Sequence, residues 1–214
     1  MGFIVAIDGP AAAGKGALAA RLGETFGLPV LDTGLLYRAV AATVLREGDD
    51  LSDEAACAAA ARSIDLKALD AIALRSAVMG EAASRVAAHP TVREALIAAQ
   101  RAFAAQASGA ILDGRDIGTV IAPTAQAKLF VTASAEARAR RRWLERQAVG
   151  EAADYETILA DIRRRDDRDS HRAAAPLTAA ADAVLLDTTD LSIDAAFDAA
   201  RRIVEAARAR AQAD

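Results

Sequence analysis

Apolar residues in this chain gather into short runs that alternate with longer stretches of helical periodicity. The first run covers residues 3–7, and similar runs recur at 28–31, 110–113, 127–132 and 183–186. Each run is bounded by turn-forming residues and followed by a helical pattern, as buried parallel strands are. We therefore expect an α/β fold with one five-stranded parallel sheet and helices on both faces.

The segments between these runs predict the helices. The first helix is expected over about residues 15–26, and a second follows Asp32. A last helix is expected to begin near Ser192, with its buried face formed by Ile193, Phe197, Ala200 and Val204. Such an apolar stripe at helical spacing favours packing against the sheet.

Residues 47–109 contain no convincing strand pattern. Their capping signals are helical: Ser52 is expected to cap a helix with an acidic first turn, and Thr91 with Glu94 is expected to form a capping box after Pro90. We interpret residues 47–109 as a helical insert in a single domain whose core comprises residues 1–46 and 110–214.

Size and charge limit the kind of protein. The 214 residues suffice for one α/β domain with a substantial core. A formal net charge of −4 and a pI near 5.3 argue against a general nucleic-acid or membrane-surface binder. The single cysteine, Cys57, fits a reducing compartment, and no apolar run is long enough to span a bilayer. We expect a cytoplasmic protein, monomeric, with no nucleic-acid or membrane partner.

The first apolar run leads into a loop that is typical of a phosphate cradle. The loop reads Gly9-Pro10-Ala11-Ala12-Ala13-Gly14-Lys15-Gly16 and precedes an alanine-rich helical stretch. Its glycines let the backbone approach an anion, its amides and the helix N-terminus face phosphate oxygens, and Lys15 supplies a charge for the terminal phosphates. The alternative is an ordinary strand–turn–helix in which the glycines only make the turn.

Ligands of a parallel sheet bind beyond the carboxyl ends of its strands. Asp113 ends one predicted strand, where it is placed to hold Mg²⁺ directly or through water, because this hard cation prefers oxygen ligands and keeps several waters. A helix-capping aspartate is the alternative interpretation of Asp113.

Arginines outside the loop indicate a second phosphorylated ligand. Arg38 follows Tyr37 after the second predicted strand, and Arg115 lies in Asp113-Gly114-Arg115-Asp116. Arginine makes forked contacts with phosphate that lysine cannot make.

The charged run at residues 163–172 permits two interpretations. Mixed charge at helical spacing is usually a solvated face. However, Arg165, Asp169 and Arg172 fall at positions i, i+4 and i+7, so one helical stripe could bind phosphate through its arginines and ribose hydroxyls through its aspartate. The cluster at residues 138–142 is likewise open between surface charge and a face toward donor phosphates, through Arg138, Arg140, Arg141 and Arg142.

Five motifs in register over nearly the whole chain resemble bacterial cytidylate kinases, which belong to the nucleoside monophosphate kinases with a P-loop. They are Gly9-Pro10 through Lys15-Gly16, Leu31-Asp32-Thr33-Gly34 with Tyr37-Arg38, Ala83-Ser84 followed by Val92-Arg93-Glu94-Ala95-Leu96, Asp113-Gly114-Arg115-Asp116-Ile117-Gly118-Thr119, and Arg165-Asp166-Asp167-Arg168-Asp169 with Arg172-Ala173. The resemblance implies transfer of the terminal phosphoryl group of ATP to CMP or dCMP with Mg²⁺. It also implies a P-loop NTPase-type fold whose helical insert binds the nucleoside monophosphate.

The resemblance implies roles for individual residues. Positions matching the acceptor site are Thr33, Tyr37, Arg38, Ser84, Arg93, Arg115, Asp116, Arg165, Asp169 and Arg172. Of these, Ser84, Arg93 and Asp116 match positions that read cytosine, Asp169 matches the one that holds the sugar, and Arg38, Arg115 and Arg172 surround the acceptor phosphate. The donor site comprises residues 9–17 with Arg141, and Lys15 joins Arg38, Arg115, Arg141 and Arg172 as the residues expected to act in catalysis.

The sequence departs from the family pattern at two places. Ala17 stands where family members have threonine, and the stretch from residue 64 to 80 is shorter than in many relatives. A short lid is expected at about residues 148–156. Two alternatives stay open: another small-metabolite kinase, such as a shikimate or gluconate kinase, and a non-catalytic nucleotide-binding regulator.

Overall fold

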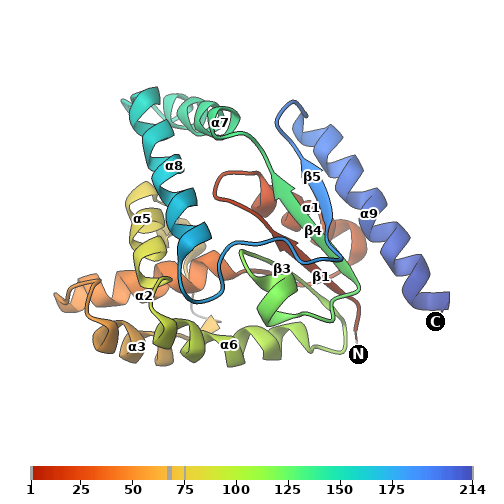
Figure 1. Cartoon of the computed structure of the whole chain (residues 1–214), viewed down its shortest axis with the longest axis horizontal. Helices are drawn as coiled ribbons and strands as arrows, with labels where there is room; N and C mark the ends of the chain where they lie inside the picture. The colour runs from red at the N-terminus through yellow and green to blue at the C-terminus, as the bar shows by residue number, and fades with distance from the viewer. Residues whose placement is uncertain (1, 67–68, 75, 214) are drawn as a thin grey trace.

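The five expected strands form one parallel sheet in a computed structural model that describes residues 2–66, 69–74 and 76–213 (Figure 1). The strands are β1 (Ile4–Asp8), β2 (Val30–Asp32), β3 (Ala110–Gly114), β4 (Ala127–Thr132) and β5 (Val184–Asp187). Their order is β2-β3-β1-β4-β5, and every neighbouring pair is parallel. The carboxyl ends of the strands therefore meet at one edge of the sheet.

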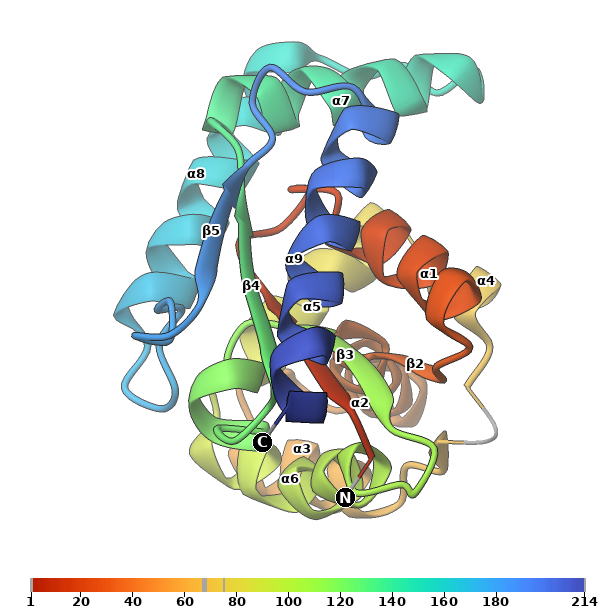
Figure 2. The same cartoon turned by 90° about the vertical axis from the view of Figure 1, so that its right-hand side faces the viewer.

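Helices cover both faces of this sheet, as the alternation of patterns predicted. On one face α1 (Lys15–Phe26) and α9 (Ile193–Ala213) pack against β1, β3 and β4, and α9 crosses the front of the sheet in Figure 2. On the other face lie α6 (Pro90–Ala104) and a π-helix, η2 (Ile117–Ile121). The buried strands and the two helical layers give the core that the 214-residue length allows.

The described residues between β2 and β3 form helices joined by turns and include no strand. They comprise α2 (Thr33–Glu47), α3 (Glu54–Arg62), α4 (Ala71–Leu74), α5 (Ala77–Val86) and α6. One hydrophobic cluster joins α2, α3, α5 and α6 and includes Leu36, Val44, Cys57, Val86 and Val92. Because α2 is part of this cluster, the helix packs with the insert that follows it, and the expected insert boundary at residue 47 stays a prediction. The short stretch at 64–80 lies partly outside the described residues.

Two expected helix caps are wrong. Asp53 rather than Ser52 caps α3, because its Oδ1 accepts the amides of Ala55 and Ala56 at 2.9 and 3.0 Å. Thr91 does not form a capping box with Glu94: its hydroxyl and amide instead bond Glu54 Oε1, which ties α6 to α3. In both cases a side chain one step along the chain, or on a neighbouring helix, offers the better acceptor geometry.

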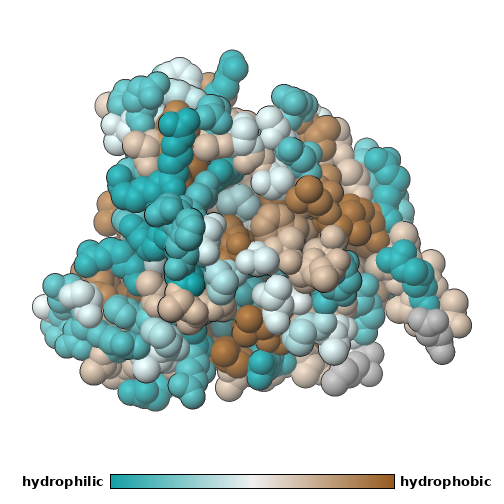
Figure 3. Space-filling model, in the orientation of Figure 1, coloured by the Kyte–Doolittle hydropathy of each residue, from teal (hydrophilic) through white to brown (hydrophobic). Residues whose placement is uncertain are grey.

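The expected buried face of α9 holds except at its first residue. Ala200 and Val204 are fully buried and Phe197 packs partly buried against the core, whereas Ile193 is 69% exposed. Ile193 is the first helical residue, so its side chain precedes the part of α9 that reaches the sheet. Hydrophobic side chains are also exposed on the edge strand β5, where Figure 3 shows them gathered.

Two helices, α7 (Ala135–Ala148) and α8 (Tyr155–His171), pair with each other beyond the sheet edge (Figure 1). Ala139, Ile158, Leu159 and Ile162 form a small buried cluster between them. Their connection, residues 149–154, falls within the expected lid at 148–156, and Trp143 Nε1 donates to the Ala153 carbonyl at 3.0 Å. None of the helices in the described part of the chain is long and apolar enough to cross a bilayer.

Candidate active site

The loop after β1 has a backbone shape that leaves amides free for an anion. Gly9 adopts φ +145°, and a Cβ there would lie 1.9 Å from the Val131 carbonyl oxygen, so a side chain is excluded. Gly14 is left-handed at φ +89° and begins α1 without a side-chain cap. The first amides of α1 therefore have no side-chain acceptor, as in an anion site at a helix N-terminus.

Lys15 lies inside this loop rather than in solvent. It is 5% exposed, its Nζ donates to the Pro10 carbonyl at 2.9 Å, and it stands 3.7 Å from Asp113 Oδ1. Burial and the neighbouring Arg115 hold the pKa of Lys15 below its ordinary value, against the opposite pull of Asp113. A polyphosphate placed in the loop would favour the charged ammonium, so the position suits a phosphate-binding lysine.

Asp113 lies at the carboxyl end of β3, beside Asp32 in the register of β2 and β3. Burial raises the pKa of Asp113, Lys15 lowers it, and Asp32 raises it further. Gly16 leaves space beside this carboxylate, since an added Cβ would lie 3.6 Å from Asp113 Oδ2. Oxygen donors beside a phosphate loop fit Mg²⁺. Among the described residues no group of three or more acidic, His or Cys side chains could hold a metal, so the remaining ligands would be phosphate oxygens and water.

Arg93 and Asp116, two of the three residues expected to read a base, meet beside η2, whereas the third, Ser84, bonds Asp169. Arg93 from α6 forms a short buried ion pair with Asp116, and Arg172 Nη2 lies 3.7 Å from the other oxygen of Asp116. The Arg93 guanidinium also lies over the Tyr37 ring, 5.5 Å from its centroid. We call Tyr37, Arg93, Asp116 and Arg172 the base cluster.

A second group surrounds Asp169 of α8. Arg115 Nε lies 3.0 Å and Arg165 Nε 3.9 Å from Asp169 Oδ2, while the Ser84 hydroxyl donates to Asp169 Oδ1 at 3.2 Å. Burial raises the pKa of Asp169, but Arg115 and Arg165 outweigh it and hold the pKa below its ordinary value. Asp169 is therefore ionised at neutral pH. We call Ser84, Arg115, Arg165 and Asp169 the Asp169 cluster.

The base cluster and the Asp169 cluster together bring four arginines to two carboxylates, and we call this region the arginine-rich cleft. Burial lowers the pKa of Arg165 to about 10, with a further contribution from Arg115. Buried nitrogens of Arg165, Arg168 and Arg172 have no hydrogen-bond acceptor. Arg38 donates to the carbonyls of Leu74 and Ser76 and, like Arg165, lies close to Gly80. Unmatched buried donors of this kind indicate an anionic ligand.

Arg172 does not lie on the predicted helical stripe. Helix α8 ends at His171, and Arg172 follows it in an extended conformation with ψ 143°. The side chain therefore leaves the helix direction and reaches Asp116, while Arg165 and Asp169 keep the i, i+4 contact that the sequence indicated. The structure thus joins Arg172 to the base cluster.

Three arginines of α7 fall into two groups: Arg138 makes structural contacts, and Arg140 and Arg141 line a cavity. Arg138 is buried, pairs with Asp166 of α8 through both terminal nitrogens, and donates to the Ala11 carbonyl of the phosphate loop at 3.1 Å. Arg141 donates to the Thr188 carbonyl and hydroxyl after β5. Arg138 is therefore not a surface charge: it links α7, α8 and the phosphate loop, a role that neither interpretation included.

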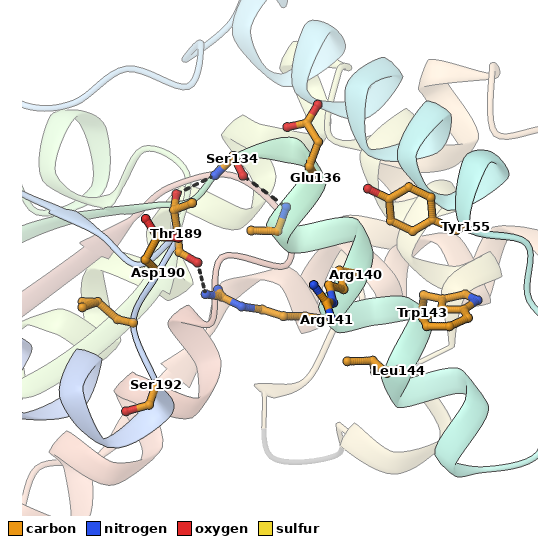
Figure 4. A pocket seen from close by; sticks show the side chains of 12 residues that line it. Ser134, Glu136, Arg140, Arg141, Trp143, Leu144, Tyr155, Thr189, Asp190 and Ser192 are labelled. Atoms are coloured by element: carbon orange, nitrogen blue, oxygen red, sulfur yellow. Dashed lines mark hydrogen bonds between the residues drawn. The ribbon is translucent and has the colours of Figure 1, made fainter.

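Arg141 lies in a cavity of about 840 Å³ between α7 and the connection from β5 to α9 (Figure 4). Figure 4 shows its side chain extending toward Thr189, with Trp143 and Tyr155 on the opposite side. The lining also includes Ser134, Arg140 and Asp190. The cavity combines aromatic and polar walls, which suits the base and sugar of a nucleotide.

Three residues hold the site together through contacts that the sequence did not predict. Asp166 and Arg138 are the pair just described, and Asp8 accepts two amides of η2. Asp8 carried a signal, because an acidic residue at the tip of a buried strand requires partners. The Arg138–Asp166 pair carried none, since its members are 28 positions apart within charged runs.

A parallel sheet of this strand order, with a phosphate loop after its central strand and an arginine-rich cleft at the same edge, defines a P-loop kinase for a phosphorylated acceptor. Residues 5–207 match the family described as Cytidylate kinase, and the chain belongs to that family.

Similar proteins span nearly the whole chain. A cytidylate kinase of Xanthobacter autotrophicus is 65% identical over 207 residues, covering 97% of this chain and 99% of the relative. One of Caulobacter vibrioides is 58% identical over 210 residues, covering 98% and 99%. A crystal structure of an uncharacterized protein from Eubacterium ventriosum has a TM-score of 0.55 at 14% identity, covers 96% of this chain and 99% of that one, and shares the fold.

Proposed function

We propose that the phosphate loop binds ATP and that the arginine-rich cleft binds CMP or dCMP in line with it. As a member of the cytidylate kinase family, the chain transfers the terminal phosphoryl group of ATP to CMP or dCMP, giving ADP and CDP or dCDP. The observation that carries the site assignment is convergence: base-reading and phosphate-binding candidates from α2, α5, α6, α8 and the β3–η2 segment meet at the sheet edge where the loop lies.

The donor assignment follows from the shape of the loop. Residues 9–17 present backbone amides to the polyphosphate, and Lys15 neutralises the terminal phosphates. The cavity lined by Arg141, Trp143 and Tyr155 receives the base and sugar of ATP, since it opens beyond β4 and β5 at the same edge. Ala17 offers no hydroxyl to the phosphates, so affinity for ATP depends on the amides and Lys15.

The acceptor assignment divides between the two clusters. In the base cluster, Asp116 accepts the amino group of cytosine and Arg93 donates to its ring acceptors. Ser84 and Asp169 meet the sugar and the edge of the base. Arg38, Arg115, Arg165 and Arg172 would donate to the acceptor phosphate or hold its neighbours in place. The phosphate would also supply acceptors for the buried nitrogens of Arg165 and Arg172 that have none. The Thr33 hydroxyl donates to the Asp113 carbonyl at 2.9 Å and so joins the start of α2 to the end of β3, between the donor and acceptor sites.

The transfer needs no general base from the protein. A nucleotide phosphate has a second pKa near ~6, so its attacking oxygen is already unprotonated at neutral pH. Catalysis is then alignment of the two phosphates together with neutralisation of charge on the moving group by Lys15 and the cleft arginines. Mg²⁺, when bound with ATP, supplies further neutralisation, and Asp113 with its water shell would hold it.

Water competes with CMP as the nucleophile, so the cleft must close before transfer. We propose that residues 148–156 act as the lid, since they join the paired helices α7 and α8 that carry Arg141 and Asp169. Both clusters and the loop lie within one chain, and we propose a monomeric enzyme, testable by light scattering at assay concentration.

An acceptor panel tests the function directly. ADP production is measured with ATP and Mg²⁺ and with CMP, dCMP, UMP, AMP or shikimate as acceptor. We expect CMP and dCMP to be used well and UMP poorly, with no reaction of shikimate, which has no base for Asp116 to read. Steady activity with shikimate, or no activity with CMP, would contradict the assignment.

A further inference from the structure

Asp8 joins the central strand to the segment that carries Asp116. Its Oδ1 accepts the amide of Ile117 and its Oδ2 accepts the amide of Gly118, both at 2.7 Å. The residue is 4% exposed and ends β1, immediately before Gly9. One buried carboxylate at the end of β1 therefore fixes the first turn of η2.

The other side of Asp116 is fixed by η2 itself. The Asp116 carbonyl accepts the amides of Val120 at 2.9 Å and Ile121 at 3.2 Å. The backbone at Asp116 is thus held through its own carbonyl and through the two amides that follow it. A π-helix is rare and frequently occurs at a functional site, and here its start coincides with a residue of the base cluster.

The contact between Asp8 and η2 is close-packed at Gly118. A Cβ on Gly118 would lie 3.3 Å from Asp8 Oδ2 and 3.2 Å from Lys128 Cδ. Gly118 therefore lets its amide approach the carboxylate closely. Burial raises the pKa of Asp8 to about 6, although the two amide hydrogen bonds lower it. Burial therefore disfavours the ionised carboxylate at this position.

We infer that Asp8 is a positioning residue for base selection: it sets the place of Asp116 through η2 and thereby controls how strictly the enzyme separates cytosine from uracil. The inference rests on the proposed role of Asp116. Both side-chain hydrogen bonds of Asp8 run to η2 on the acceptor side, so the effect should fall on CMP more than on ATP.

Asp8→Asn is the sharpest test. The amide keeps the shape of the carboxylate, but its NH₂ group faces one of the two backbone amides, so one hydrogen bond is replaced by a donor–donor contact. The control is Asp53→Asn, because Asp53 also accepts two backbone amides at a helix start, in α3 and away from both nucleotides.

The readouts are kcat/KM for CMP and for UMP at saturating ATP, and KM for ATP. We expect Asp8→Asn to raise KM for CMP and to lower the CMP-to-UMP ratio by about tenfold, the equivalent of one misplaced buried hydrogen bond. KM for ATP should stay within about twofold of the native value. Asp53→Asn should leave the ratio unchanged.

Gly118→Ala disturbs the same contact from the other side and should lower the ratio in the same direction, which keeps the test decisive if Asp8→Asn fails to fold. Folded variants with the native ratio, or equal losses for CMP, UMP and ATP, would overturn the positioning role. A native ratio near one would instead overturn the base-reading role of Asp116, and with it this inference.

Discussion

In the proposed assignment, the donor loop and the acceptor cleft would bind similar phosphates by different physical means. The loop is a contiguous segment that presents backbone amides and one lysine, Lys15. The cleft is assembled from side chains distant in sequence, and its arginines are paired with Asp116 and Asp169 before any substrate arrives. An anion alone can be bound by local backbone shape, whereas recognition of a base and sugar requires charged side chains that the fold must place and pair.

Pairing makes the cleft sensitive to single substitutions. Removing one member of a buried ion pair leaves an uncompensated charge, which costs ~3–5 kcal/mol. The Arg93–Asp116 pair is buried at both members. In the loop the phosphate-binding amides belong to the backbone and no side-chain substitution removes them. Lys15 is therefore the main binding group that a substitution can delete. The following changes separate the two regions.

The largest effect is expected in the loop. Lys15→Ala removes the charge that acts on the transferred phosphoryl group, and kcat should fall about 10²- to 10³-fold. Thermal unfolding should change less than kcat, because the substitution relieves the burial penalty of Lys15, and Asp113, which loses this partner, still has the favourable charge of Arg115 nearby. The matched control is Lys128→Ala. Lys128 is also buried but bonds Asp182 and the Pro123 carbonyl, so its loss should lower the melting temperature and spare kcat. Near-native turnover of Lys15→Ala would show that the loop assignment is wrong.

In the cleft, Asp116→Asn should change selectivity more than rate. A carboxylate pairs with the amino group of cytosine and repels the carbonyl of uracil, and an unmatched buried polar group costs ~1–3 kcal/mol, or roughly ten- to hundredfold. The native enzyme should prefer CMP to UMP by at least that factor. The amide can turn its donor toward uracil, so the variant should narrow the gap, measured as the ratio of kcat/KM values. If the ratio does not change, Ser84 and Arg93 become the candidates for base reading.

Gly80→Ala should separate stability from binding in the cleft. The new Cβ would lie 3.3 Å from Arg38 Nη2 and 3.4 Å from Arg165 Nη1, so both guanidinium groups must move. Gly80 lies within α5, where alanine favours the helix by ~0.5–1 kcal/mol. We expect a higher melting temperature together with a severalfold higher KM for CMP and an unchanged KM for ATP. A KM for CMP equal to the native value would indicate that these arginines do not contact the acceptor.

The smallest effect is expected from Ala17→Thr. The variant restores a hydroxyl beside the donor phosphates and should lower Kd for ATP a few-fold, with kcat nearly constant. Calorimetry with ATP and Mg²⁺ measures it, and CMP binding serves as the internal control. Unchanged or weaker ATP binding would show that the loop amides already satisfy the phosphates.

The same contrast explains what could be predicted from the sequence. The bounds of α1 and β4 agree with the apolar pattern, because a strand–loop–helix is a local structure. Arg165 and Asp169 could be paired by helical spacing alone. The position of Arg172 could not be predicted, because it depends on where α8 ends. The cap of α3 was predicted one residue too early, at Ser52 instead of Asp53, because the exact residue at which a helix begins depends on backbone geometry. The links from Asp8 to η2 and from Arg138 to Asp166 arise from tertiary packing and leave no periodic trace.

The indole of Trp143 gives this protein a built-in optical reporter. Trp143 is the single tryptophan of the chain, and its N–H is bonded to the Ala153 carbonyl in the connection between α7 and α8. Breaking that bond would move the fluorophore between a hydrogen-bonded and a hydrated environment. Fluorescence emission excited at the indole band would therefore report the proposed movement of residues 149–154 in real time, without a label and without background from any other tryptophan.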